Sequence, residues 1–231
     1  QFIKLSVYLS SLFSSNFFSS STPTVTARLF YNQSKYDGND ISANSNDDAA
    51  IATDKMAYLS GSDAITTFAN ISSYSKGING IMIDIAGRRS NITSADFTFK
   101  IGNNDTPASW ANAPVPTVTI RDSDDLSRIT LIWPNGAIKN TWLGVTVAAN
   151  ANTGLTVPFS FYFGNLIGDS GLGNSATVAV TSNIDVTAIF GNLSGNVPVA
   201  NLYDFNRSGS VDTTDAAIAQ KFSNLTLNFI T

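Results

Sequence analysis

Cysteine and histidine are both absent from this chain of 231 residues. Without cysteine there is no disulfide framework, no thiolate nucleophile and no zinc–thiolate centre. Without histidine, a Ser–His–Asp triad and the usual zinc and copper sites are excluded. If the protein is extracellular, it needs another means of stabilisation, and calcium held by oxygen ligands is the candidate that remains.

Charged residues are scarce as well. They make up 13% of the sequence, about half of the share that is usual in globular proteins. Ser, Thr, Asn and Gly take their place, a composition typical of extracellular β proteins. The formal net charge is −4 and the one adjacent basic pair is Arg88–Arg89, so a nucleic-acid surface is not indicated. An acidic balance favours a metal cation as partner.

Long apolar runs are also missing. No stretch reaches the roughly 18 apolar residues that a membrane span requires. Residues 1–21 have the composition of a secretion signal, but the chain starts with Gln, so we interpret them as part of the mature protein. Hydrophobic residues make up 43%, enough for a folded core. We expect a folded, extracellular or cell-surface protein with no membrane span.

The first 23 residues are predicted to form an N-terminal arm. Apolar and polar residues alternate here, which is the pattern of a strand with one buried face. The apolar positions are Ile3, Leu5, Val7 and Leu9. A Ser- and Thr-rich stretch over 19–23 then indicates a linker. The arm is therefore an extension strand that precedes the main domain.

Residues 24–163 carry eight short stretches rich in β-branched and aromatic residues, separated by Asn-, Asp- and Gly-containing turns. The predicted strands cover 25–31, 65–71, 80–86, 95–101, 117–121, 128–133, 142–149 and 155–163. Strands of this length and spacing favour a β-sandwich, of the immunoglobulin- or cohesin-like kind.

Residues 164–231 have a different character, with polar loops that precede short segments of helical spacing. The segment 183–192 aligns with 215–224 at an offset of 32 residues. Two repeats, each a loop followed by a helix, predict a small α domain stabilised by calcium.

The loop 204–215 has oxygen-bearing residues at the positions that an EF-hand-type calcium loop requires. The candidate ligands are Asp204, Asn206, Ser208, Ser210 through its carbonyl, Asp212 through water, and Asp215. Gly209 permits the sharp turn, and Val211 is expected to anchor the loop in the core. The alternative is a polar surface loop of Asx turns ahead of a helix. In the preceding repeat Asp169, Asn174 and Asn183 are candidate ligands, although Leu172 and Ala176 stand where further oxygens are expected.

The segment Asp204–Phe222 resembles one repeat of the type I dockerin family, which uses Asp at the last loop position. Residues 77–82, 139–154 and 161–171 also resemble large secreted surface proteins of planctomycete-type bacteria that end in dockerin-like repeats. The resemblance covers roughly residues 25–227. It implies secretion and calcium, and it implies no activity. Dockerins also bind cohesin partners through Ser–Thr-type pairs, whose positions Thr213 and Thr214 occupy.

Other candidate sites are weaker. The acidic residues Asp37, Asp40, Asp47, Asp48 and Asp54 admit a third calcium, but a solvated loop is the favoured interpretation. The three tryptophans are expected in the core rather than on a sugar-binding platform. Candidate glycosylation positions are Asn32, Asn70, Asn91, Asn104, Asn192 and Asn224.

These observations predict a structural protein and not an enzyme. The leading hypothesis is an extracellular subunit that forms a filament or surface layer by donating its N-terminal strand to a neighbour. The strand can also fold back onto its own domain. The alternatives are a dockerin-type module that tethers to a cohesin-like partner, and a carbohydrate-binding domain.

Overall fold

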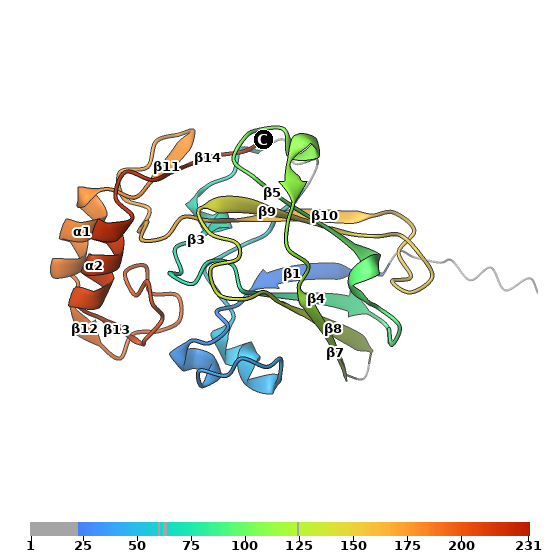
Figure 1. The fold of residues 1–231 in the computed structure, drawn as a ribbon. Helices are drawn as coiled ribbons and strands as arrows, with labels where there is room; N and C mark the ends of the chain where they lie inside the picture. Colours follow the sequence, from blue (N-terminus) through green and yellow to red (C-terminus); the bar gives the residue numbers. More distant parts are fainter. Residues whose placement is uncertain (1–22, 60, 62–63, 124) are drawn as a thin grey trace, which may run out of the picture.

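The computed structural model describes residues 23–59, 61, 64–123 and 125–231. The fold is mainly β, with several antiparallel sheets and few helices (Figure 1), so the predicted fold class is confirmed at that level. The predicted arm, with Ile3, Leu5, Val7 and Leu9, lies outside the described residues. Among the described residues, no helix combines the length and the apolar character that crossing a bilayer requires.

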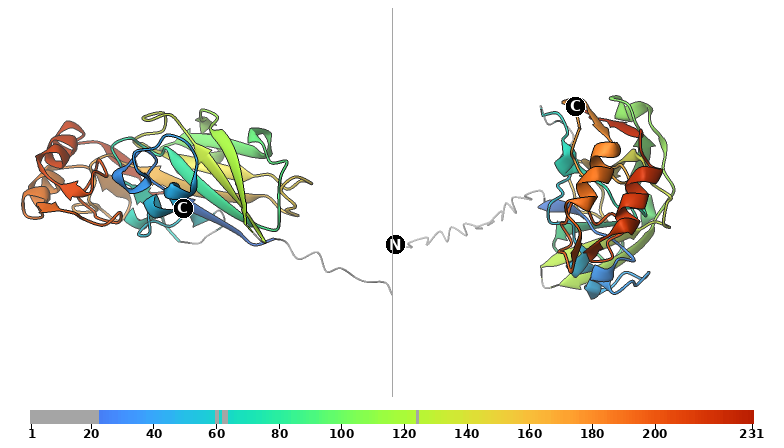
Figure 2. Two further views of the ribbon diagram at one scale, coloured as in Figure 1. Left: turned by 90° about the horizontal axis from the view of Figure 1, so that it is seen from below. Right: turned by 90° about the vertical axis from the view of Figure 1, so that its left-hand side faces the viewer.

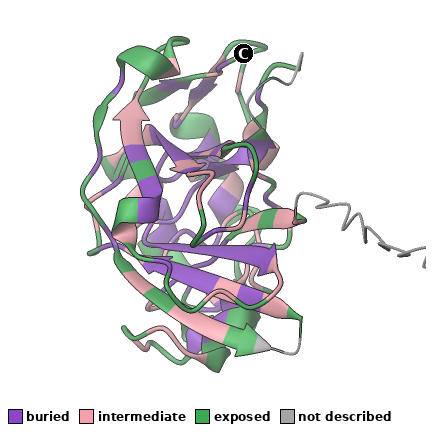
Figure 3. Cartoon of the chain, turned by 90° about the vertical axis from the view of Figure 1, so that its right-hand side faces the viewer, coloured by how far each residue is buried: buried purple, intermediate pink, exposed green. Residues whose placement is uncertain are grey.

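Within the described residues, the first sheet has four antiparallel strands in the order β1-β4-β8-β7. Their bounds are β1 (Val25–Leu29), β4 (Gly80–Ala86), β8 (Leu126–Ile132) and β7 (Thr117–Ser123). Strands β4 and β8 are central and largely buried, whereas β1 and β7 form the two edges. Figure 3 shows the edge strand β7 in the colours of intermediate and exposed residues, while the central strands are mostly buried.

The second sheet has the order β2-β10-β9-β5-β6, and β3 pairs in parallel with β10. Its strands are β2 (Tyr58–Leu59), β3 (Ile71–Ser72), β5 (Phe97–Gly102), β6 (Ala111–Asn112), β9 (Thr141–Val147) and β10 (Phe159–Asn165). The predicted strand over 65–71 is wrong for most of its length. Thr67 and Asn70 form a reciprocal capping box there, which closes a turn of 3-10 helix, η3 (Phe68–Asn70).

The two sheets face each other across one hydrophobic core. Because side chains alternate along a strand, every second residue of the central strands points inward. The inward residues include Ile81, Ile83, Ile85, Ile129, Leu131, Leu143, Val145, Val147, Phe161 and Phe163. Trp133 packs edge-to-face against Phe99, with ring centroids 5.6 Å apart. All three tryptophans are buried, as predicted.

In the part of the chain that the structure describes, four short 3-10 helices lie in the connections besides η3. They are η1 (Lys35–Asp37), η2 (Ser45–Ala50), η4 (Ser94–Asp96) and η5 (Pro107–Ser109). The η1–η2 segment lies on the outer face of the first sheet, where Ala50 packs with Phe30 and Met82. This explains why β4 is buried on both faces.

The C-terminal part of the chain forms two short helices that pack side by side, at one end of the sheets (Figure 2). They are α1 (Asn183–Phe190) and α2 (Thr213–Lys221). Two small antiparallel ladders accompany them, β11 (Val178–Val180) with β14 (Thr226–Asn228) and β12 (Ser194–Gly195) with β13 (Ser210–Val211). Each predicted loop is thus followed by a helix.

The helical unit shares a core with the second sheet. Leu227 and Ile230 pack in one cluster with Ile71 and Trp142. The Trp142 Nε1 atom donates to the Asn228 carbonyl at 2.6 Å, and the Thr66 amide donates to the Ile230 carbonyl at 3.0 Å. The chain end therefore packs against the second sheet. The predicted C-terminal domain, which begins at residue 164, shares this core with the sheets.

Candidate metal-binding loops

The loop 204–215 runs directly into α2. Asp212 is the N-cap of this helix, and its side chain accepts from the Thr214 amide at 2.7 Å. Asp215 reaches back to the Asp212 amide at 3.0 Å, which completes a capping box. The Asp212 side chain is thus engaged in capping and exposed, whereas Asp215 is buried. Val211 is buried, as the sequence predicted.

The sharp turn of the loop occurs at Gly209. Its φ is +80°, a conformation that side-chain-bearing residues rarely adopt. The Gly209 amide and the Ser208 amide both donate to the Asp204 carboxylate, at 2.9 and 3.0 Å. The first residue of the loop therefore organises its turn.

Asp204 and Asp215 form a pair of fully buried carboxylates. Asp204 accepts from Ser208 N, Gly209 N and the Tyr36 hydroxyl. Asp215 accepts from the amides of Phe205, Asn206 and Asp212. A carboxylate has about four lone-pair sites, so each keeps about one acceptor position after these three bonds.

The neutral oxygens of the loop lie close to one another. Asn206 Oδ1 accepts from the Ser208 amide at 2.8 Å, and Ser208 Oγ donates to the Ser210 carbonyl at 3.3 Å.

Burial raises the pKa of Asp215, and the nearby negative charge of Asp204 raises it further. A cation between the two carboxylates would remove this repulsion.

The first repeat has the same arrangement around Asp169 and Asp185, both fully buried. Asp185 is the third residue of α1 and forms a capping box with Ser182, as Asp215 does with Asp212. Its Oδ1 atom accepts from the amide and hydroxyl of Ser170, at 2.9 and 2.6 Å. Ser170 follows Asp169 as Phe205 follows Asp204.

The structure therefore aligns Asp185, and not Asn183, with Asp215. The offset between the helices is 30 residues, and the predicted offset of 32 is wrong. Asn183 is exposed in the first turn of α1. The Ser182-x-x-Asp185 spacing is the sequence signal that identifies Asp185, because the same cap-to-third-residue spacing recurs at Asp212.

The pKa of Asp169 is strongly raised. Burial raises its pKa to about 7, and the neighbouring Asp185 contributes in the same direction. Asn174 Nδ2 donates to both oxygens of Asp169, at 3.3 and 3.0 Å, while Asn174 Oδ1 accepts from the Val180 amide. The predicted ligand Asn174 thus contacts Asp169 through its nitrogen.

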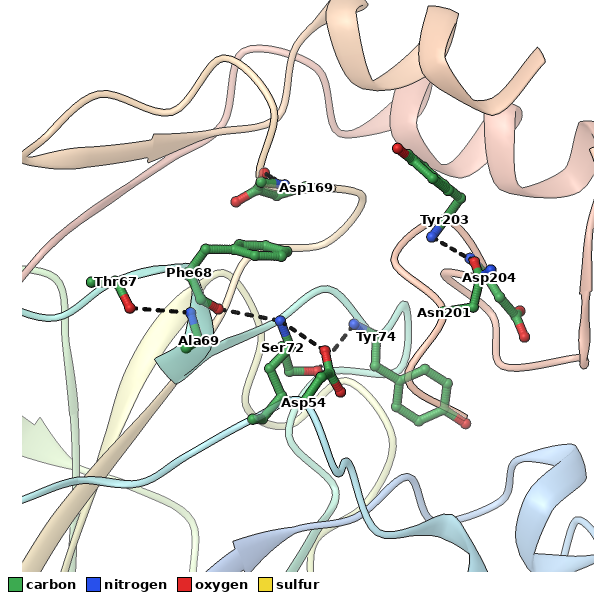
Figure 4. Close-up of polar contacts among 12 residues, drawn as sticks. Asp54, Thr67, Phe68, Ala69, Ser72, Tyr74, Asp169, Asn201, Tyr203 and Asp204 are labelled. Atoms are coloured by element: carbon green, nitrogen blue, oxygen red, sulfur yellow. Dashed lines mark hydrogen bonds and ion pairs between the residues drawn. The ribbon is translucent and has the colours of Figure 1, made fainter. Parts of the chain in front are cut away.

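A buried lysine lies near the Asp169 carboxylate of the first loop. Lys55 is buried; its Nζ atom lies 3.2 Å from an Asp54 oxygen and 3.7 Å from the centre of the Phe68 ring. Burial lowers the pKa of Lys55, and the carboxylates of Asp54 and Asp169 oppose this effect. Figure 4 shows Asp54 and Phe68 below Asp169, and Asn201 beside Asp204.

The donor chemistry determines which metal the loops suit. Within the described ranges, no three Asp, Glu, His or Cys side chains converge in an arrangement that could hold a metal ion. The 204–215 loop instead combines a buried carboxylate pair with amide, hydroxyl and carbonyl oxygens. The first loop combines the buried pair Asp169 and Asp185 with the Ser170 hydroxyl. Oxygen-only donors of this kind fit calcium and do not fit zinc or copper.

Two of the predicted glycosylation positions are corrected by the structure. Asn32 is fully buried. Asn70 is buried as well, with Nδ2 donating to the Met56 carbonyl and Oδ1 accepting from the Thr67 amide. A glycan cannot be attached to a side chain packed in this way. The exposed positions are Asn91, Asn104, Asn192 and Asn224.

No known protein family, curated protein or solved structure matches this chain.

Proposed function

We propose that this protein is an extracellular structural subunit, and not an enzyme, which assembles into a filament or surface layer by donating its N-terminal strand and is stabilised by calcium. In this proposal the two facing sheets are a β-sandwich of the immunoglobulin- or cohesin-like kind. The C-terminal unit is dockerin-like, with Ca²⁺ held in the loops of Asp204/Asp215 and Asp169/Asp185.

The observation that carries the proposal is the relation between the two edges of the first sheet. The arm precedes β1, which is one edge. The opposite edge is β7, a seven-residue strand whose one strand neighbour in the described part of the chain is β8. Alternate residues of an edge strand present amides and carbonyls to a further strand. Donor and acceptor on opposite edges produce a head-to-tail contact, which propagates into a fibre.

An apolar pocket on the same side of the molecule supports this assignment. It has a volume of about 400 Å³ and is lined by residues of β5, η4 and the connection from β6 to β7, including Phe97, Phe99, Ala113 and Val115. Val115 is 65% exposed. Strand β6 pairs with β5 only at Lys100 and Ile101, so the start of β5 has no strand on this side among the described residues.

The arm matches this edge in length and pattern. Its alternating stretch from Ile3 to Leu9 spans seven residues, as β7 does. A strand beside β7 would direct alternate side chains toward the pocket. Burial of four such side chains contributes on the order of 6–10 kcal/mol before entropy costs.

The experiment compares the full chain with variants at two valines of similar exposure. Val115→Lys places a charge in the pocket, and Val157→Lys, at a residue 62% exposed and outside that pocket, is the matched control. Negative-stain microscopy and analytical ultracentrifugation in calcium report assembly. We expect the full chain and Val157→Lys to assemble, and Val115→Lys and a chain lacking residues 1–20 to stay monomeric. Assembly that survives the deletion contradicts the proposal.

One observation favours tethering as a second candidate function. The outer face of α1 exposes Ile184 (54%) and Phe190 (56%), and a pocket of about 450 Å³ lies along Ile184, Thr187 and Ala188. The helix carries one charge, the buried Asp185. Such a face suits a protein partner of the cohesin-like kind. A calcium-dependent pull-down with such a receptor, lost in Ile184→Lys, would support tethering. The buried tryptophans offer no comparable support for carbohydrate binding.

A further inference from the structure

Two oxygens in the segment 32–47 are buried with no hydrogen-bond partner among the described residues. They are Asn32 Oδ1 and Asp47 Oδ1, and both residues are fully buried. An acceptor removed from water without a partner is destabilising and rare in native proteins. Each such atom therefore calls for a ligand, and two of them occur in one short segment.

Both side chains are held against the loop that joins η1 to η2. Asn32 Nδ2 donates to the Ile41 carbonyl at 3.5 Å, which places its amide group beneath this loop. Asp47 Oδ2 accepts from the Asn44 amide at 2.9 Å as part of the capping box of η2. Each group thus has one atom bonded to the loop and one oxygen that is left to bind a further ligand.

A second buried carboxylate adjoins them. Asp37 is fully buried and accepts from the amides of Gln33 and Asn39, at 2.5 and 2.9 Å. Burial raises the pKa of Asp37 and of Asp47, and the charges of Asp37 and Asp40 raise the pKa of Asp47 further. The sequence favoured a solvated loop, and that interpretation is wrong for Asp37 and Asp47.

Neighbouring cations do not account for the two buried carboxylates. Arg121 lowers the pKa of Asp47, but its guanidinium pairs with Asp48. Lys76 lies near Asp37, but its Nζ atom donates to the Gln33 carbonyl at 2.5 Å. Among the described residues, neither Asp37 nor Asp47 forms an ion pair.

We propose that the segment 32–47 holds a divalent cation of the calcium class, independent of the C-terminal loops. Asp47 Oδ1 and Asn32 Oδ1 are direct ligands, Asp37 supplies the second negative charge, and the Ile41 carbonyl is a neutral ligand. Two carboxylates balance a 2+ ion, and this all-oxygen donor set suits calcium. The ion would fix the η1–η2 segment on the outer face of the first sheet, next to β1.

The test is calcium stoichiometry and affinity of the full chain, by native mass spectrometry and isothermal titration calorimetry. Asp47→Asn keeps an oxygen for the Asn44 amide but removes the charge. We expect it to bind one calcium ion fewer than the unmodified chain, while Asp48→Asn, at the exposed neighbour, leaves the count unchanged. Asp204→Asn should remove a different ion, so Asp47→Asn combined with Asp204→Asn should lose two.

A gain-of-affinity variant keeps the test decisive if Asp47→Asn does not fold. Asn32→Asp adds a carboxylate at the unpartnered oxygen, and should tighten one calcium site by about tenfold or more, since ligand charge sets calcium affinity. An unmodified chain that binds no calcium outside the C-terminal loops, or an Asn32→Asp variant with unchanged affinity, overturns the proposal. Filament formation is read out separately, so its failure does not affect this result.

Discussion

Arg207 stacks on Tyr31 and so joins the C-terminal loop to the sheets. Its guanidinium lies 4.3 Å from the centre of the Tyr31 ring, and Nη2 donates to the Tyr31 hydroxyl at 3.0 Å. Nη1 donates to the carbonyls of Asn201 and Asp204, at 2.5 and 2.6 Å. Arg207 is 1% exposed. A residue at the fourth position of the loop is thereby fixed in the interior of the molecule.

Replacement of Arg207 by Met is expected to lower the free energy of unfolding by roughly 3 kcal/mol or more, because two carbonyls and a phenol lose their buried donor. Urea denaturation followed by tryptophan fluorescence measures the change. Arg88→Met, at an exposed arginine, is the control and should change stability by less than about 0.5 kcal/mol. Equal stabilities of the two variants would show that the Arg207 contacts contribute little.

The pKa of Asp169 predicts that stability falls as the pH rises in chelator. Its folded pKa of about 7 exceeds the unfolded value of about 3.9, so the native state holds the proton more tightly. The stabilisation is complete below about pH 4 and is lost as the pH rises through 7. Three pH units correspond to a loss on the order of 4 kcal/mol.

Denaturation in urea at pH 4.5 and 7.5, with EDTA, measures this loss. Asp169→Asn should show a much smaller difference between the two pH values, because the amide does not ionise. Calcium at pH 7.5 should restore stability to the unmodified chain and much less to the variant. A pH dependence that Asp169→Asn leaves unchanged assigns the titration to another group.

The sequence predicted the strands of the two sheets better than it predicted the site. The β-branched stretch over 80–86 coincides with β4, and the loop-plus-helix signals located α1 and α2 to within a few residues. Both predictions rest on local patterns, which depend only on residues that are close together in the sequence. The same kind of local pattern wrongly predicted a strand over 65–71. There the capping box of Thr67 and Asn70 stabilises a turn of 3-10 helix instead.

The features of the site that depend on long-range contacts were not predictable. The burial of Asp37 and Asp47 follows from packing of η1 and η2 against β4, and the sequence records only their charge. Likewise, no local pattern indicates the burial of Arg207, because its partner Tyr31 is 176 positions away. The pairing of Asp169 with Asp185 was missed because the first loop is longer than the second. Asp169 and Asp185 are 16 positions apart, whereas Asp204 and Asp215 are 11 positions apart.

Calcium removal is expected to lower the melting temperature. At a calcium concentration a hundred times the dissociation constant, one site contributes about 2.7 kcal/mol, which corresponds to roughly 5–10 °C in a chain of this size. Differential scanning calorimetry with calcium and with EDTA measures the shift. Asp204→Asn should remove part of it. Asp125→Asn, at an exposed loop residue, should keep all of it, and a melting temperature indifferent to EDTA would exclude calcium from the folded state.

Trp142 is expected to control the attachment of the chain end. Its Nε1 atom donates to the Asn228 carbonyl at 2.6 Å, and its side chain is fully buried beside Leu227. Trp142→Phe leaves that carbonyl without its donor and a smaller ring in the same space, a combined cost of about 2–4 kcal/mol. Local opening of residues 226–231 then needs less free energy than unfolding of the sheets.

Hydrogen exchange followed by mass spectrometry separates the two processes. In Trp142→Phe we expect faster exchange in the 226–231 peptide, with β4 and β8 still protected. Trp133→Phe is the matched control, because that buried indole donates to the Pro114 carbonyl at 2.8 Å and packs in the core between the sheets, not against the terminal strand. Equal protection of residues 226–231 in the two variants would mean that the indole hydrogen bond contributes little. The attachment of β14 would then depend on its ladder with β11, on Ile230 and on its hydrogen bonds with Asn103.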